Sequence, residues 1–315
     1  MSTVRTLLPT DLPALLAHPG LSSENTAFPR ERLGAGDSQA TLSVMADQLR
    51  AFARQRSAWV SMRRQRLLGL VGARQRGGNG AWEIDYLLDA TPESRVTSDL
   101  LEYVVAQAGK DGAQKVFLRL PADSDLLQPV LESGFLAYQE ETLFAGGVAS
   151  VPNRETPAGL RGAAASDSYP LFRLYCTATP ESTRRFEAAT FDEWHDAQER
   201  RWLKNGLHLV LERDSRLRGQ VRVSRLPQGL MLDLLIDSEA SEDAAGLLSA
   251  AVAATESTAE PVLVLLPQAA EGVARALQSD GFIASTRYVS LMRRTTKPLA
   301  LPRKVPVVAK NAIGV

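Results

Sequence analysis

The segment Val116-Phe117-Leu118-Arg119-Leu120-Pro121 is followed further along the chain by Glu132-Ser133-Gly134-Phe135. The same arrangement returns at Val262-Leu263-Val264-Leu265-Leu266-Pro267, which is followed by Ser279-Asp280-Gly281-Phe282. A short, nearly continuous apolar run of this kind is typical of a strand buried on both faces in a βαβ unit. Because an unrecognised repeat leads to the wrong fold for a whole chain, we examined the rest of the sequence for the same period.

Three further matches precede this one in the same order, at offsets that decrease slowly along the chain. The matching segments are Val4-Arg5 with Asp11 and Leu160-Arg161 with Asp167, Gly69-Leu70-Val71 and Gly219-Gln220-Val221, and Leu87-Leu88-Asp89 and Leu235-Ile236-Asp237. Four ordered matches indicate a tandem duplication. We therefore predict a first repeat at 1–145, a linker rich in Gly, Pro, Ser and Asn at 146–159, a second repeat at 160–296 and an extended, proline-containing tail at 297–315.

Within each repeat, the spacing of apolar residues predicts one order of elements. In the first repeat we expect strands at 4–7, 58–63, 67–73, 82–88 and 116–120, a closing strand from Phe135, and helices at 11–17, 39–54, 123–133 and from 91–93 to about Gly109 or Gly112. In the second we expect helices at 169–175, 191–204, 241–256 and 269–279, and strands at 207–212, 219–224, 230–236, 262–266 and 282–292. The predicted fold class is α/β (α+β), with two tandem domains that each hold a mixed, mostly antiparallel sheet flanked by helices.

Composition limits the possible functions without choosing one. The 315 residues are 44% hydrophobic, with 36 basic and 36 acidic residues, so no overall charge attracts nucleic acid or an anionic membrane. Cys176 is the only cysteine, and the histidines, His18, His195 and His208, are scattered, so we expect neither a disulfide nor a metal site. Asp11 and nearby prolines interrupt any apolar core near the start, and no apolar run is long enough to cross a bilayer. We expect a cytoplasmic protein.

The order of elements, with Gly134-Phe135 and Gly281-Phe282 before the closing strands, resembles the GNAT superfamily of N-acetyltransferases over nearly all of both repeats. This resemblance implies transfer of an acetyl group from acetyl-CoA to an amine. It also implies a Gln/Arg-x-x-Gly-x-Gly/Ala loop, whose backbone N–H groups bind the cofactor pyrophosphate at a helix N-terminus.

Both glycines of that loop are missing from each repeat. In the first, its key positions fall on Pro92, Arg95 and Thr97, which leaves as candidate cofactor contacts, by position, Leu88, Arg95, Val96 and Thr97. In the second they fall on Glu239, Glu242 and Ala244, with Asp243 among them, and carboxylates there oppose a bound phosphate. We expect acetyl-CoA, if it binds, in the first repeat and no cofactor in the second.

The acid–base groups implied by the resemblance are also replaced. Val130 and Leu277 stand where the family often has a tyrosine that protonates the leaving thiolate. Glu83 and Asp85 alternate with apolar residues, so they are either candidate catalytic bases or part of a solvated polar face. The same alternatives apply to Asp233.

A stretch of arginines without any acidic residue runs from Arg50 to Arg76, namely Arg50, Arg54, Arg56, Arg63, Arg64, Arg66, Arg74 and Arg76. It could hold the 3′-phosphate of CoA, an acidic partner or a nucleic-acid backbone, or it could be the solvated side of a helix and hairpin. Aromatic residues are not interleaved with it, which argues against single-stranded nucleic acid. The group Phe191-Asp192-Glu193-Trp194-His195 and the thiol of Cys176 are interpreted as packing residues.

Two functions therefore remain open on sequence grounds. One is an N-acetyltransferase whose activity on an unidentified amine is weakened or lost. The other is a non-catalytic binding or assembly module built on the duplicated fold.

Overall fold

A computed structural model describes residues 3–11, 15, 25–35, 57–64, 66–90, 94–151, 153–203, 206–255 and 261–295. The predicted helix 39–54, the helix start at 91–93, most of the helix 11–17 and the tail 297–315 lie outside these residues.

The first repeat contains the predicted three antiparallel strands, a helix and a buried strand. Its elements are β1 (Thr3–Thr6), η1 (Pro9–Asp11), η2 (Arg30–Arg32), β2 (Ser57–Arg63), β3 (Arg66–Gln75), β4 (Ala81–Asp89), α3 (Ser94–Lys110), β5 (Lys115–Pro121), α4 (Leu127–Glu132), β6 (Leu136–Gly146) and η4 (Val148–Ser150). The helix predicted at 123–133 is shorter, because Ser124 N donates to Pro121 O and Leu127 N to Ser124 O in consecutive turns.

The second repeat has the same order with additional short helices. Its elements are β7 (Leu160–Gly162), η5 (Ala165–Asp167), α5 (Ser168–Ala178), α6 (Glu181–Glu187), α7 (Phe191–Ala197), η6 (Arg201–Leu203), β8 (Leu207–Arg213), β9 (Arg216–Leu226), β10 (Gly229–Ile236), η7 (Ser238–Asp243), α8 (Ala244–Ala253), β11 (Val262–Pro267), α9 (Glu271–Ser279) and β12 (Ile283–Arg294). The helix predicted at 191–204 is interrupted, because Gln198 adopts an extended conformation (φ −64°, ψ 124°). The sequence did not indicate α6.

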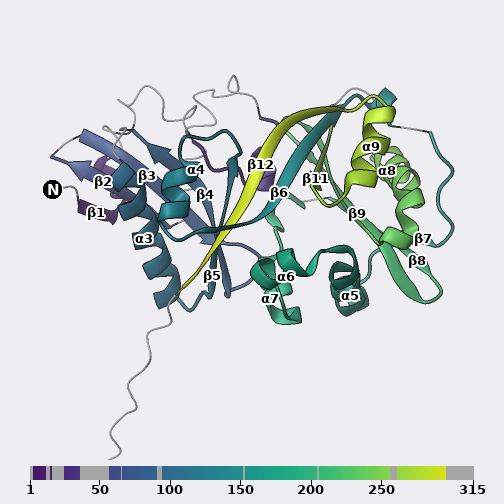
Figure 1. Ribbon diagram of the computed structural model, residues 1–315, viewed down its shortest axis with the longest axis horizontal. Coiled ribbons are helices and arrows are strands. Elements are labelled where there is room, and N and C mark those ends of the chain that lie inside the picture. The colour runs from purple at the N-terminus through teal and green to yellow at the C-terminus, as the bar shows by residue number, and fades with distance from the viewer. Residues whose placement is uncertain are drawn as a thin grey trace, which may run out of the picture.

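The twelve strands that the structure describes belong to one sheet, in the order β1-β2-β3-β4-β5-β12-β6-β11-β10-β9-β8-β7. Among the described strands only β4 with β5 and β10 with β11 are parallel, so the sheet is mixed and mostly antiparallel, as predicted. Figure 1 shows the sheet extending through both repeats, with the two long strands β6 and β12 side by side near its middle. The repeats therefore share one sheet.

The closing strands are exchanged between the repeats. Strand β12, from the second repeat, lies between β5 and β6, and Leu291 stands opposite Leu118 of β5. Strand β6, from the first, lies beside β11, and Phe144 stands opposite Val264. Each repeat thus supplies five consecutive strands of its own and receives its sixth from the other.

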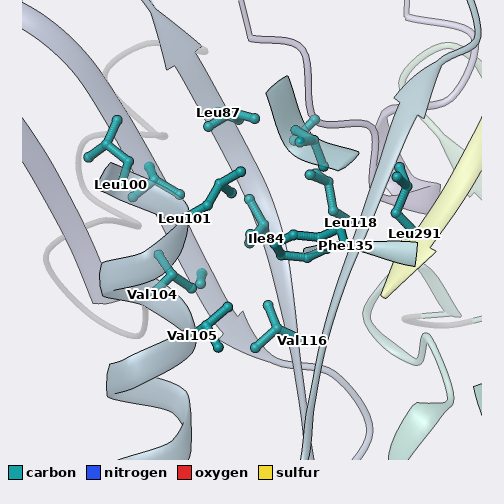
Figure 2. Close-up of a cluster of buried hydrophobic side chains, with 14 of the residues drawn as sticks. Ile84, Leu87, Leu100, Leu101, Val104, Val105, Val116, Leu118, Phe135 and Leu291 are labelled. Atoms are coloured by element: carbon teal, nitrogen blue, oxygen red, sulfur yellow. The ribbon is translucent and has the colours of Figure 1, made fainter. Parts of the chain in front are cut away.

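Two cores follow this exchange. The first surrounds α3, whose Leu100, Leu101 and Val104 pack against the sheet, and it includes Leu291 from β12 (Figure 2). The second surrounds α8 and α9 and includes Phe144 from β6. On the opposite face of the sheet, α5, α6 and α7 pack against residues of β5, β6, β8 and β9.

Local geometry repeats as the sequence predicted. Arg5 contacts both carboxylate oxygens of Asp11, at 2.6 and 2.7 Å, and Arg161 contacts those of Asp167 at 2.7 and 2.9 Å. In each case the carboxylate also accepts a backbone N–H three residues earlier. Gly134 and Gly281 both have positive φ, 79° and 90°, which explains glycine before the closing strand.

Candidate functional site

The two parallel strands of the first repeat diverge, and the start of α3 follows the end of one of them. Strands β4 and β5 pair only between Ala81–Glu83 and Lys115–Phe117. Ligands of open α/β sheets bind beyond the carboxyl ends of such strands. The resemblance to the GNAT superfamily implies the cofactor phosphates at the same end, so this region is the candidate site.

A segment of the chain itself, Asn25–Phe28, lies between the diverging strands. Thr26 N donates to Leu87 O on β4 at 3.0 Å, and Phe28 N donates to Arg119 O on β5 at 3.0 Å. The side chain of Asn25 is buried, and its Oδ1 accepts from Leu87 N at 2.9 Å. Both backbone polar groups of Leu87 are therefore satisfied by this segment, which we call the bridging segment.

The four predicted cofactor contacts do not form an anion site. Leu88, Val96 and Thr97 are fully buried or nearly so, and only Arg95 is exposed. Thr97 Oγ1 donates to Asp89 Oδ2 at 2.6 Å, which places a carboxylate at the start of α3. Carboxylate charge opposes a bound phosphate there. With the bridging segment in place, the residues that the structure describes at this end of β4 and β5 do not fit acetyl-CoA.

The second repeat also places carboxylates at the equivalent helix start. Asp237 accepts from Glu239 N and from Arg218 Nη1, the latter at 2.9 Å, and Arg218 Nη1 also contacts Glu239 Oε2 at 2.8 Å. Arg213 pairs with Asp243 at 2.8 Å, and Ala244 is buried. Within the described residues of this repeat, no segment donates backbone hydrogen bonds to both β10 and β11. These carboxylates likewise do not fit a pyrophosphate.

Glu83 and Asp85 are buried, with 6% and 2% of their surfaces exposed, so the interpretation as a solvated face is wrong. Arg74, on the neighbouring strand β3, lies 2.9 Å from Glu83 Oε2 and 3.1 Å from Asp85 Oδ2. Burial raises the pKa of Glu83. The charge of Glu199 raises it further, and the charge of Arg74 lowers it in part. Val130 and Leu277, at the tyrosine positions, are core residues.

Asp233 is largely covered rather than solvated, with 13% of its side chain exposed. It accepts from Arg222 Nε at 2.8 Å and lies 2.8 Å from Arg30 Nη1. Burial opposes its ionisation, but the two arginines outweigh burial and lower the pKa of Asp233. Arg30 belongs to the first repeat, so this carboxylate joins the repeats.

Glu199 is the centre of the contact between the repeats. It accepts from Arg76 Nη2 at 2.8 Å and from Arg119 through two nitrogens, at 2.8 and 3.2 Å. Arg119 also donates from Nε to Glu141 Oε2 at 2.7 Å. Burial opposes ionisation of Glu199, but the arginines outweigh it and hold its pKa well below the usual range. We call Arg30, Arg74, Arg76, Arg119, Arg222 and their carboxylate partners the junction cluster.

The arginine stretch does not form a single surface patch. Arg74 and Arg76 are buried in the junction cluster, which corrects the expectation of surface charge for these two. Their partners Glu83 and Glu199 come from β4 and the second repeat, and sequence order does not reveal them. Arg63, Arg64 and Arg66 are exposed around the β2–β3 turn, and Arg50, Arg54 and Arg56 lie outside the described residues.

The group around His195 is part of helix α7, where Trp194 packs against Phe172 and Tyr175. His195 is partly exposed, and its Nδ1 lies 3.7 Å from Asp196 of the same helix. Cys176 packs near this aromatic cluster. In the described part of the chain, no three His, Cys, Asp or Glu side chains gather as metal ligands. No described helix is long and apolar enough to cross a membrane.

Sequence reasoning missed Arg119, Glu141 and Glu199 as members of one site. Arg119 carried a signal, because it interrupts an otherwise apolar strand and a buried arginine requires an acidic partner. Nothing in the sequence around Glu199 indicates that it is buried, since the pattern there predicts a continuous surface helix.

No protein-family model matches the chain, and no curated protein matches it. Solved structures do. A tandem GNAT protein from the clavulanic acid biosynthesis pathway aligns with a TM-score of 0.54 at 14% identity, over 93% of this chain and 98% of that one. A GCN5-related N-acetyltransferase from Sphaerobacter thermophilus aligns with a TM-score of 0.54 at 14% identity, over 93% of this chain and 95% of that one. A putative acetyltransferase from Pyrococcus horikoshii aligns with a TM-score of 0.52 at 12% identity, over 94% of this chain and 90% of that one. The chain has the tandem GNAT fold.

Proposed function

We propose that this chain, which has the tandem GNAT fold, is a non-catalytic binding module in which acetyl-CoA-dependent transfer to an amine has been lost. The bridging segment carries this proposal. Thr26 and Phe28 donate to opposite strands at the divergence of β4 and β5, so a ligand that enters there must first break buried hydrogen bonds. An unsatisfied buried backbone group costs about 1 to 3 kcal/mol.

Charge supports the same conclusion in both repeats. Asp89 lies at the start of α3 and Asp237 at the start of η7, the positions where the fold's cofactor phosphates are implied. A phosphate placed there meets a carboxylate instead of free N–H groups. Buried Val130 and Leu277 also offer no acid for a leaving thiolate.

The test is calorimetric titration of the full chain with acetyl-CoA, together with a transfer assay on a panel of primary amines. We expect neither binding heat nor acetylated product. Acetyl transfer that Arg95→Glu abolishes would overturn the proposal, because it would place an active site at the start of α3. The matched control is Arg66→Glu, which reverses an exposed charge on the edge of the β2–β3 turn.

A further inference from the structure

A cavity of about 160 Å³ lies on the second repeat between helix α5 and the start of β9. Its apolar floor is formed by Leu174 and Leu217, both buried. Helix α5 packs on the face of the sheet opposite α8, and the cavity borders the start of η7, with which it shares Arg218 and Asp237. In Figure 1, α5 lies below the sheet, beside β9.

Positive charge lines this cavity. Arg173, Arg216 and Arg218 contribute to its walls, and Asp237 is its one acidic lining residue. Asp237 is already bound by Arg218 Nη1. Arg173 and Arg216 are exposed, and within the described residues neither pairs with a carboxylate. The cavity therefore has excess positive charge that an anion would neutralise.

An aromatic ring stands at the same cavity. Tyr169 lines it with 59% of its surface exposed, although large apolar rings are usually covered. The ring also contacts the rings of Phe191 and Phe172, with centroids 5.8 and 6.2 Å away. A ring fixed in this way offers a flat surface on which a planar group can stack.

We propose that this cavity binds a small planar organic anion, an aromatic or conjugated carboxylate. Its ring stacks on Tyr169, and its carboxylate pairs with Arg173 and Arg216, whose planar guanidinium groups match carboxylate geometry. Pockets for drug-sized ligands measure roughly 300 to 1,000 Å³, so a volume of about 160 Å³ suits a single ring. The binding does not depend on whether acetyl transfer has been lost.

The test is calorimetric titration of the full chain with benzoate, benzamidine and inorganic phosphate. Benzoate and benzamidine share a ring but carry opposite charges, and phosphate carries charge without a ring. We expect saturable one-to-one binding of benzoate, no binding of benzamidine and weaker binding of phosphate. Equal affinity for benzoate and benzamidine would contradict the claim that the cavity prefers an anion. Phosphate binding as tight as that of benzoate would contradict the claim that the ligand needs a planar ring.

Variants locate the binding. The double variant Arg173→Gln, Arg216→Gln should lower the affinity for benzoate at least about tenfold, because hydrogen bonds to charged groups are lost. Tyr169→Leu should weaken the binding of benzoate and leave the binding of phosphate unchanged. Arg185→Gln is the control, since Arg185 is exposed on α6 and does not line the cavity. Unchanged benzoate affinity in the double variant would contradict the proposal, and circular dichroism confirms that each variant is folded.

Discussion

The carboxylate of Glu199, on the second repeat, accepts two hydrogen bonds from the guanidinium of Arg119, on the first, at 2.8 and 3.2 Å. Both side chains are buried. Because Arg76 donates to the same carboxylate, Glu199 pairs with two arginines of the other repeat. The repeats are thus joined by a buried ionic contact as well as by the exchanged strands.

Glu199→Gln should destabilise the protein strongly, because it leaves Arg76 and Arg119 buried without full compensation. Breaking a buried ion pair costs about 3 to 5 kcal/mol. Urea denaturation measures the change in the free energy of unfolding. Glu155→Gln, which removes an exposed carboxylate from the linker, is the control and should change stability little. A loss below about 1 kcal/mol for Glu199→Gln would show that the contact is dispensable.

Leu291→Ala tests the strand exchange. Leu291 is fully buried in the core around α3, although it comes from the second repeat. We expect a loss of about 2 to 5 kcal/mol, together with faster hydrogen exchange in β5 and α3. Leu266→Ala, in the core around α8, is the matched variant and should act on β10 and α8 instead. Unchanged protection of β5 in Leu291→Ala would contradict the exchanged order.

Gly69 and Gly219 test the close approach of a helix to the sheet in each repeat. A Cβ at Gly69 would lie 2.9 Å from Leu100 Cδ1 and from Leu88 O, whereas at Gly219 the close contact is Leu247 Cδ1 at 2.9 Å. Backbone yields less than a side-chain end, so Gly69→Ala should cost more than Gly219→Ala, within about 1 to 3 kcal/mol. Gly272→Ala, in helix α9 with open space around it, should stabilise by about 0.5 to 1 kcal/mol. Thermal unfolding measures the stability of each variant. A larger loss of stability in Gly219→Ala than in Gly69→Ala would contradict this packing.

Asp167 should titrate far below an ordinary aspartate. Its hydrogen bonds to Arg161 outweigh burial and lower its pKa from 3.8 to about 2. Because the folded-state pKa is lowered, the stability that this pair provides is present above pH 3.8 and is lost as the pH falls towards about 2. Carboxyl NMR shifts measure the titration. Asp11, the matching residue, should shift in the same direction, and a pKa of Asp167 at or above 3.8 would contradict the pairing.

The sequence allowed the duplication and most elements to be predicted, because apolar periodicity and the Gly-Phe pairs lie within short segments. The exchange of β6 and β12 could not be predicted. Both strands follow the same signal, Gly134-Phe135 or Gly281-Phe282, so either could pair with the sheet of either repeat. Local pattern specifies a strand but not its neighbour.

The candidate site was predicted less well for a related reason. Glu83, Asp85 and Arg74 were recognised as charged residues, but their burial depends on partners remote in sequence, such as Glu199. The bridging segment Asn25–Phe28 has no apolar period, and its role depends on backbone groups that every sequence contains. Arg119 was the one residue whose type conflicted with its apolar surroundings.

The most direct test of the central claim is hydrogen exchange at the amides of Thr26 and Phe28, measured with and without a large excess of acetyl-CoA. Because these amides donate to Leu87 O and Arg119 O at 3.0 Å, they should exchange slowly, and acetyl-CoA should not change their rates. Fast exchange in the free protein, or loss of protection when acetyl-CoA is added, would show that the space between β4 and β5 is available to the cofactor.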